Sequence, residues 1–383
     1  MSTDDPEAEG PRRFRLMKGI ELTPRQLLYI ALGGLALFLI PEIQGVQSSL
    51  RVRTVYVGLC WGLAALGLNL LLRHTELVSF GHAAFFGSGA YGAAFAARYG
   101  GVEEAVLLVF AGILLATTLA VLIGWLVSGY LDIYFALITL AFNQLLFAIV
   151  MGNPRLLGSD DGLGVRPESE LLRPTVFGLE LSSAQYEVLT YYVLILVILV
   201  MLVVTWRFIN SPFGRALDAI GQDRTRARFI GIPVKRYIWL TFVASAVYGG
   251  LAGGLYSLSM LHVRPGNTLF ALRSGEILFM AILGGFKTLL GPNVGGNVLT
   301  YMLTELRFAT EYWEFATGFL LLLVVFLLPN GVIGSAPVIA GGIKDRARNP
   351  GILSDDASFL GGLLKSKLSD AAETGKLLLF GVK

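Results

Sequence analysis

Six polar side chains interrupt the long apolar stretches of this chain, and these are the residues best placed to do chemistry away from water. They are Asn69, His82, Asn143, Gln144, Glu276 and Asn297. Polar and ionisable groups are costly in an apolar medium, so they usually face a cavity, a partner or an interface. For Glu276 two interpretations stay open: a role in a transport path or gate, or an ion pair with Arg273. His82 either contacts a substrate or forms a structural hydrogen bond to a neighbouring helix, and the same choice holds for Asn69 and Asn143.

No catalytic constellation accompanies these side chains. The sequence contains no G-x-x-x-x-G-K-[ST] phosphate-binding loop, no H-E-x-x-H and no G-x-S-x-G. One cysteine, Cys60, and three dispersed histidines, His74, His82 and His262, exclude a disulfide framework and a clustered metal site. We therefore expect a protein that is not an enzyme, that carries no cofactor, and that does not itself hydrolyse ATP.

Residues 207–236 form a polar island between two apolar runs. Seven of its thirty residues are Arg or Lys, against two acidic residues. Ser211-Pro212 is a helix start signal and Gly231 to Pro233 a stop signal, so a helix is predicted between them. A basic helical loop between membrane spans is typical of a docking surface for a partner on the cytoplasmic side.

The elements that must position these residues are membrane helices. The chain has 383 residues, 55% of them hydrophobic and 15% charged, with a mean hydropathy of +0.68. A soluble globular protein carries about 25% charged residues, and about 20 apolar residues suffice to cross a bilayer as a helix. The predicted fold class is an all-α polytopic membrane protein in a lipid bilayer, with no nucleic-acid partner.

About ten transmembrane helices are predicted. They fall at 26–41, 54–72, 78–97, 104–127, 132–150, 186–206, 237–259, 271–290, 292–309 and 313–329. The third is rich in Gly and Ala and barely long enough, so a broken or re-entrant helix is an alternative to a full span. Two glycine sets create thin helix faces, and a third predicts a turn: Gly81, Gly87, Gly89 and Gly92; Gly249, Gly250, Gly253 and Gly254; Gly284-Gly285 with Gly291-Pro292. Such glycines serve tight packing or line a pathway.

Counting Lys and Arg on alternate sides orients these spans. With a cytoplasmic N-terminus, 21 fall on the cytoplasmic side and 8 on the other. We therefore expect N- and C-termini in the cytoplasm, with a leader at 1–25, a transmembrane domain at 26–334 and a tail at 335–383. The polar island 207–236 then lies inside. The loop 151–185 lies outside, where it covers the outer mouth or meets an external partner.

Seven groups of short motifs follow one another across residues 54–334. They are GLNL at 67–70; SFGHAAFFG at 79–87 with GAY at 89–91; YFA at 134–136 with TLAF at 139–142; GSDDGL at 158–163; GRAL at 214–217 with AI at 219–220 and GI at 231–232; Ser274 and Glu276 with LGG at 283–285 and GP at 291–292; and PNG at 329–331. In this order they resemble the permease subunits of branched-chain amino acid ABC importers. The resemblance is to the longer, M-type permease of the leucine/isoleucine/valine high-affinity system.

The resemblance implies an ABC importer permease fold in a prokaryotic plasma (inner) membrane. It also implies a homologous second permease, two ABC ATPase subunits and an extracytoplasmic substrate-binding protein as partners. The loop 207–236 would form the coupling helix that contacts an ATPase, with these matching positions: Gly214, Arg215, Ala219, Asp223 and Gly231. The substrate path or gate would draw on Asn69, Ser79, His82, Asn143, Glu276, Gly284 and Gly285.

The chain departs from the family pattern at three places on the predicted cytoplasmic face. It has Arg73-His74-Thr75-Glu76 where the family usually has a Gly-containing turn, Gly221 and Arg224 where it commonly has Arg and an acid, and Lys287 where it has Gly. These departures indicate a basic surface matched to an acidic partner. The predicted function is import of branched-chain or other hydrophobic amino acids. The alternatives are a urea or short-amide permease, a sugar or nucleoside permease, and an ATP-independent carrier or channel.

Overall fold

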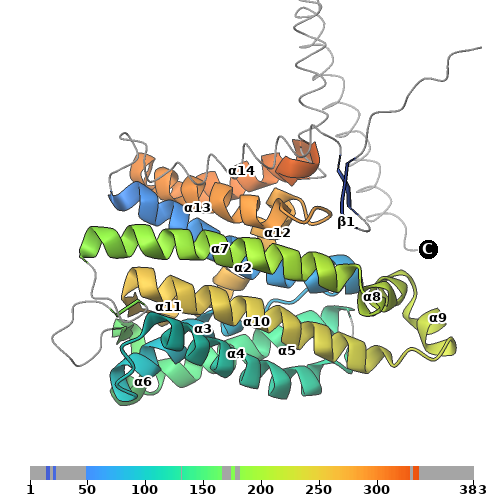
Figure 1. Ribbon diagram of the computed structural model, residues 1–383, viewed down its shortest axis with the longest axis horizontal. Helices are drawn as coiled ribbons and strands as arrows, with labels where there is room; N and C mark the ends of the chain where they lie inside the picture. Colours follow the sequence, from blue (N-terminus) through green and yellow to red (C-terminus); the bar gives the residue numbers. More distant parts are fainter. Residues whose placement is uncertain are drawn as a thin grey trace, which may run out of the picture. The chain divides into compact units, whose positions relative to one another are not determined.

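The computed structural model of the protein describes residues 14–17, 20–22, 49–130, 132–165, 174–176, 182–327 and 331–335 (Figure 1). The chain divides into two compact units, Met1–Gly334 and Ser335–Lys383. The predicted span at 26–41 lies outside the described residues, as do most of the leader and the tail beyond Ser335. The division of the chain into leader, transmembrane domain and tail stays a prediction.

Helices dominate the first unit. In chain order they are α2 (Ser49–Thr75), α3 (His82–Tyr99), α4 (Ala105–Val127), α5 (Asp132–Met151), α6 (Pro154–Leu157), η2 (Ser159–Asp161), α7 (Ser183–Ile209), α8 (Pro212–Gln222), α9 (Arg224–Phe229), α10 (Val234–Met260), α11 (Pro265–Thr268), α12 (Ala271–Gly284), α13 (Gly291–Ala309) and α14 (Trp313–Leu327). Two short antiparallel pairs join β1 (Phe14–Met17) to β2 (Ile20–Leu22) and β3 (Leu163–Gly164) to β4 (His262–Val263).

Every predicted span from 54–72 onward coincides over most of its length with one of these helices. Among the described residues, five helices are long and apolar enough to cross a membrane: Val52–Thr75, Ala105–Val127, Asp132–Met151, Gln185–Ile209 and Val234–Met260. The chain is therefore an all-α multi-pass membrane protein. The count of ten crossings and the cytoplasmic position of both termini stay predictions.

Two predicted spans were placed wrongly at one end. The span predicted at 78–97 begins only at His82, because Gly81 has non-helical backbone angles and acts as its N-cap. The span predicted at 271–290 ends at Gly284, because Gly285 has a φ of 109°, which only glycine adopts easily. Gly284 and Gly285 thus form the predicted turn.

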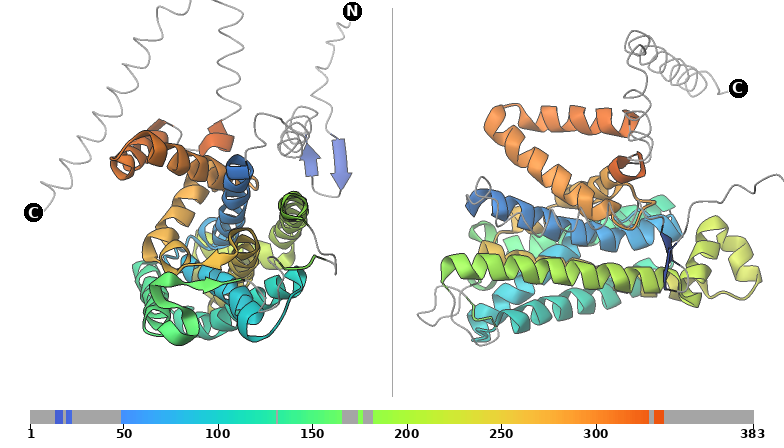
Figure 2. Two further views of the ribbon diagram at one scale, coloured as in Figure 1. Left: turned by 90° about the vertical axis from the view of Figure 1, so that its left-hand side faces the viewer. Right: turned by 45° about the horizontal axis from the view of Figure 1, so that its top comes forward.

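Helix α2 lies at the centre of the packing and contacts α7, α8, α10, α12 and α13 (Figure 1 and Figure 2). Its residues 58–71 are all buried, which explains why this stretch is apolar on every face apart from Asn69. By contrast, α4 and α7 expose large apolar side chains such as Phe110, Trp125 and Leu196. Helices that bury one apolar face and expose another fit a lipid surrounding, where an outward apolar side chain is favourable.

Three helices meet backbone to backbone at the predicted glycine faces. A Cβ added at Gly89 of α3 would overlap the backbone of Gly250 in α10. One added at Gly112 of α4 would overlap the Gly89 carbonyl. Small residues permit such close approach between membrane helices. At these positions the glycines are packing residues of the contact between α3, α4 and α10.

Residues 161–164 of the loop 151–185 pack on the connection between α10 and α12. Leu163 and Gly164 pair with Val263 and His262. The Nε2 of His262 also lies 2.6 Å from the carbonyl oxygen of Asp161, to which it donates. The described part of this loop is therefore ordered against the helices, and its contact with an external partner stays a prediction.

Candidate functional site

Several of the candidate path residues lie where α3 begins. His82 is the first residue of α3, and its Nε2 lies 2.5 Å from the Oγ of Ser245 in α10. The Ser245 hydroxyl donates to the carbonyl oxygen of Gly67 in α2 at 2.8 Å. That hydroxyl has one hydrogen, so His82 Nε2 is the donor of the first bond. A buried chain of hydrogen bonds thus joins α3, α10 and α2, which is the structural role that the sequence left open for His82.

The start of α3 also meets the start of α12. The amide of Ala83 donates to Ser274 Oγ at 2.9 Å, which satisfies one of the amides that the first turn of a helix leaves without a partner. Helix α5 joins at the same level, because Asn143 Nδ2 donates to the carbonyl oxygen of Leu269 at 3.0 Å. We call His82, Ser245, Ser274 and Asn143 the polar junction; all four side chains are buried.

The polar junction lies near the middle of the long helices. Ser245 is eleven residues from the start of α10, Val234–Met260. At 1.5 Å per residue this is about 16 Å from one end of α10 and about 22 Å from the other. Helices α3 and α12 therefore begin at the level of the middle of α10, and the broken-helix alternative for the third span stays a prediction. Discontinuous helices of this kind surround substrate sites in other transporter folds.

Two other candidate path residues are buried near the junction. Ser79 Oγ accepts a hydrogen bond from the Gly81 amide at 3.3 Å, so it shapes the turn that leads into α3. Asn69 lies on α2, and its Oδ1 has no hydrogen-bond partner among the described residues; the same holds for His82 Nδ1 and Asn143 Oδ1. Buried acceptors are usually paired, so these three atoms are able to accept further hydrogen bonds.

Glu276 differs from the junction residues because it is partly exposed. Arg273 Nη1 donates to Glu276 Oε2 at 2.6 Å, and their side chains are 19% and 24% exposed. The ion pair that the sequence left open is thus present in the first turns of α12. Gly284 and Gly285 lie at the other end of α12, roughly 15 Å beyond Ser274 at the helical rise. The structure does not bring those two glycines to the polar junction.

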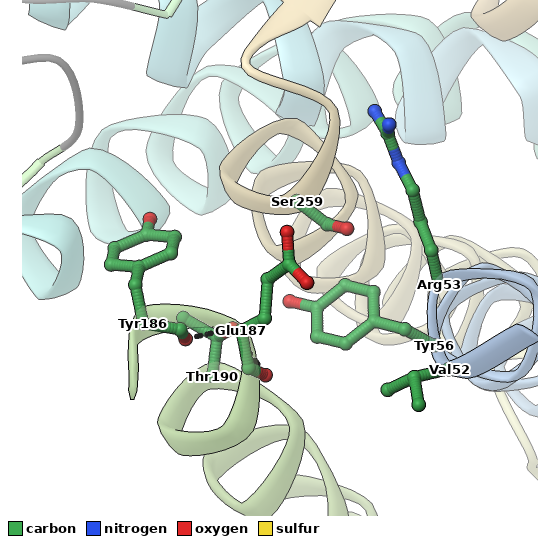
Figure 3. A pocket seen from close by; sticks show the side chains of 7 residues that line it. All are labelled: Val52, Arg53, Tyr56, Tyr186, Glu187, Thr190 and Ser259. Carbon is green, nitrogen blue, oxygen red and sulfur yellow. Dashed lines mark hydrogen bonds between the residues drawn. The ribbon is translucent and has the colours of Figure 1, made fainter. Parts of the chain in front are cut away.

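A small pocket that the sequence did not single out lies at the end of α2 away from α8. Its lining comes from α2 (Val52, Arg53 and Tyr56), α7 (Tyr186, Glu187 and Thr190) and α10 (Ser259), as Figure 3 shows. The Tyr56 hydroxyl donates to the carbonyl oxygen of Leu255 at 2.9 Å, and Arg53 Nη2 lies 3.1 Å from Met260 Sδ. These residues stand at helix ends, where polar side chains are common, so no pattern marked them.

The polar island 207–236 folds into two helices rather than one. Helix α8 begins at Pro212 after the N-cap Ser211, whose Oγ accepts from the Gly214 amide at 3.2 Å. A Cβ at Gly214 would overlap the carbonyl oxygen of Ile209, so this turn requires glycine. The start signal is confirmed, and the single predicted helix is wrong because Asp223 adopts extended backbone angles between α8 and α9.

Asp223 caps the second helix. Its Oδ1 accepts from the amides of Thr225 at 2.9 Å and Arg226 at 3.0 Å. The hydrogen bond from the Arg226 amide, with that from Thr225 and the nearby Arg226 charge, holds the pKa of the Asp223 carboxyl below its ordinary value. The stop signal is confirmed: α9 ends before Gly231, whose φ of 87° turns the chain toward α10.

The outer face of α8 and α9 combines positive charge with apolar side chains. Arg215, Arg226 and Arg228 are exposed, and so are Phe229 and Ile230, at 86% and 74%. Figure 1 shows both helices at one end of α7 and α10. Ala219 is half-buried on the inner side of this face. Within the described part of the chain, no group of His, Cys, Asp or Glu is arranged to hold a metal ion.

Comparison with known proteins identifies the family. The profile of the family described as branched-chain amino acid transport system / permease component matches residues 50–327. The chain is 27% identical over 288 residues to the high-affinity branched-chain amino acid transport system permease protein LivM of Escherichia coli, covering 70% of this chain and 66% of LivM. It therefore spans slightly less than two thirds of that relative's length.

Two further relatives agree with this assignment. The LivH permease protein of Salmonella typhimurium is 25% identical over 308 residues, covering 74% of this chain and 94% of LivH. A probable LivM of Methanocaldococcus jannaschii is 23% identical over 264 residues, covering 61% of this chain and 72% of that protein. No solved structure matches the chain. The family match covers well over half of the chain, so the protein belongs to the branched-chain amino acid transport system permease component family.

Proposed function

We propose that this chain is a permease subunit of an ATP-driven importer of branched-chain or other hydrophobic amino acids. It would form half of the substrate path in a prokaryotic plasma membrane. Its partners would be a homologous second permease, two ABC ATPase subunits and an extracytoplasmic binding protein. The names of the LivM and LivH relatives support the substrate class.

The observation that carries this proposal is the form of the coupling segment, which we define as α8 and α9. It is a capped pair of helices at the ends of α7 and α10, with an exposed basic and apolar face. Phe229 and Ile230 would bury apolar surface in a partner, while Arg215, Arg226 and Arg228 would require acidic groups around it. An ATPase subunit with an apolar groove and an acidic rim fits this face.

The polar junction and the Arg273–Glu276 pair support a path beside α12. Because Glu276 is partly exposed, it is the candidate path residue with the most direct access to a neighbouring subunit or substrate. Asn69, Ser79, His82 and Asn143 are buried and would act by fixing the broken helices α3 and α12. Gly284 and Gly285 would allow the tight turn after α12, because a Cβ at Gly284 would overlap the Gly291 carbonyl and Gly285 has a φ of 109°.

Co-purification of the tagged ATPase subunits tests the coupling surface. Arg226→Ala and Phe229→Ala should reduce the ATPase retained by the permease, with membrane insertion unchanged. Arg98→Ala, an exposed arginine at the far end of α3, is the matched control and should retain the ATPase. Full retention in both surface variants would show that the coupling segment is not the contact.

A further inference from the structure

The coupling segment is fastened to the other helices at two places. The first joins the end of α2 to the middle of α8: His74 Nδ1 lies 2.5 Å from Asp218 Oδ1. An ionised carboxylate only accepts, so His74 donates this bond. The His74 side chain is 4% exposed, whereas Asp218 is half exposed. One partner is therefore fixed within the packed helices and the other belongs to the coupling segment.

Arg224 makes the second connection. Its Nη1 donates to Asp132 Oδ1 at 2.7 Å, and its Nη2 donates to the carbonyl oxygen of Thr75 at 3.1 Å. Asp132 is the first residue of α5 and Thr75 the last of α2. The Arg224 side chain is only 18% exposed, in contrast to 87% for Arg226 two residues later. Arg224 therefore faces the helices, whereas Arg226 faces outward.

Gly221 allows both connections to form. A Cβ at this position would lie 2.7 Å from the carbonyl oxygen of His74, closer than a side chain tolerates. The helix α8 can approach the end of α2 this closely only with glycine there. His74, Gly221 and Arg224 are all positions at which the sequence leaves the pattern of the family it resembles. Their contacts show that these departures belong to one site.

We propose that His74, Asp218, Arg224 and Asp132 form a polar clamp that transmits movement of the coupling segment to α2 and α5. The proposal rests on the proposed function, since an ATPase must move the segment. Gly67 of α2 lies eight residues before Thr75, about 12 Å along a continuous helix. There it accepts the Ser245 hydroxyl of the polar junction. The clamp residues are positioning residues, because they act through α2 and α5.

The test uses the complete transporter in liposomes, with its second permease, ATPases and binding protein, and leucine as the probe. Arg224→Ala should retain the ATPase subunits and still hydrolyse ATP. The leucine taken up per ATP hydrolysed should fall roughly two- to thirty-fold, the range seen for residues that couple distant sites. Arg226→Ala should weaken ATPase retention. Arg98→Ala, outside both the clamp and the coupling segment, is the matched control and should leave ATPase retention and leucine per ATP unchanged.

Conservative variants separate the clamp from general damage. Asp132 has a φ of 55°, which Asn tolerates nearly as well as Asp. Asp132→Asn therefore removes the charge with little backbone strain and should lower leucine per ATP as Arg224→Ala does. His74→Asn keeps a donor near the place of Nδ1 and should retain more uptake per ATP than His74→Ala. If Arg224→Ala does not accumulate in membranes, Asp132→Asn decides the test.

Two results would overturn the clamp while leaving the proposed function intact. One is unchanged leucine per ATP in Asp132→Asn and Arg224→Ala. The other is loss of the ATPase subunits from Arg224→Ala as complete as from Arg226→Ala, which would place Arg224 on the docking surface. By contrast, wild-type uptake that continues without the ATPases would contradict the proposed function itself.

Discussion

Replacing Ser245 with Ala removes the central link of the polar junction. Its hydroxyl accepts from His82 Nε2 and donates to the Gly67 carbonyl, and it is fully buried. After Ser245→Ala the imidazole N–H loses its acceptor inside the protein. The Gly67 carbonyl oxygen loses one of its two hydrogen bonds, because within α2 it still accepts from the amide four residues later.

These contacts set the size of the expected effect. A buried donor left without an acceptor costs about 1–3 kcal/mol. Hydrogen bonds between membrane helices are worth about 0.6 kcal/mol on average and about 1.7 at most, because the unfolded chain in the membrane also finds partners. We therefore expect Ser245→Ala to lower the free energy of unfolding by about 1–3 kcal/mol. The coupling between His82 and Ser245 should be about 0.6–1.7 kcal/mol.

A double-mutant cycle measures this coupling directly. The free energy of unfolding would be determined by denaturant titration in mixed micelles for wild type, His82→Ala, Ser245→Ala and the double variant. Ser245→Ala should cost less when His82 is already Ala. Thr118→Ala is the control: this exposed hydroxyl bonds only within its own helix, to Leu114 O, and the change should stay within about 0.5 kcal/mol. If the costs of His82→Ala and Ser245→Ala add up to the cost of the double variant within about 0.3 kcal/mol, the link is refuted.

Four further predictions concern Gly214, Gly89, Asp223 and Glu276. Gly214→Leu should abolish ATPase retention in a pull-down while insertion persists, because its Cβ would overlap a backbone carbonyl; normal retention would contradict the fixed start of α8. Gly89→Leu should cost at least about 1–3 kcal/mol in unfolding titrations, whereas Gly275→Leu, with open space around it, should cost far less. The pKa of the Asp223 carboxyl is lowered, so its cap on α9 is complete above pH 3.8, the ordinary value, and is lost as the pH falls through the lower folded-state pKa. Hydrogen exchange of the α9 amides should therefore speed up at low pH. The Asp223→Asn variant, which has no carboxyl to protonate, should not show this pH dependence. Glu276→Gln should lower leucine uptake with ATPase retention unchanged. Normal uptake by this variant would contradict a role in the path and favour a purely structural ion pair with Arg273.

Much of the fold could be predicted from apolar runs and breaker residues. Among the described residues, the apolar stretches located the nine longer helices α2, α3, α4, α5, α7, α10, α12, α13 and α14, but not the short α6 and α11. Ser211-Pro212 marked the start of α8 correctly. Gly284-Gly285 marked the end of α12, although the predicted span ran past it. Helix ends within apolar stretches were missed because an apolar run does not show where its backbone first becomes helical. Only the non-helical Gly81 and the bond from Ala83 to Ser274 place the start of α3.

The sequence singled out candidate residues but did not show their hydrogen-bond partners. His82 and Glu276 stand out as polar residues in apolar stretches, yet their partners differ in sequence distance. Arg273 lies one helical turn from Glu276 and was foreseen. Ser245 is 163 residues from His82, and a lone serine in a membrane helix is too common to attract notice. The same holds for the contacts of Arg224, since α9 meets α2 and α5 only through the packed fold.

Uptake of labelled leucine by the reconstituted complex tests the proposed function most directly. Liposomes would contain this chain, a second permease and the two ATPases, with binding protein outside and ATP inside. We predict uptake that requires ATP and the ATPases, and that is lost when Gly214 in the coupling segment is replaced by Leu. Uptake that persists without the ATPases, or that is unaffected by Gly214→Leu, would contradict the proposal that this chain is an ATP-coupled permease subunit.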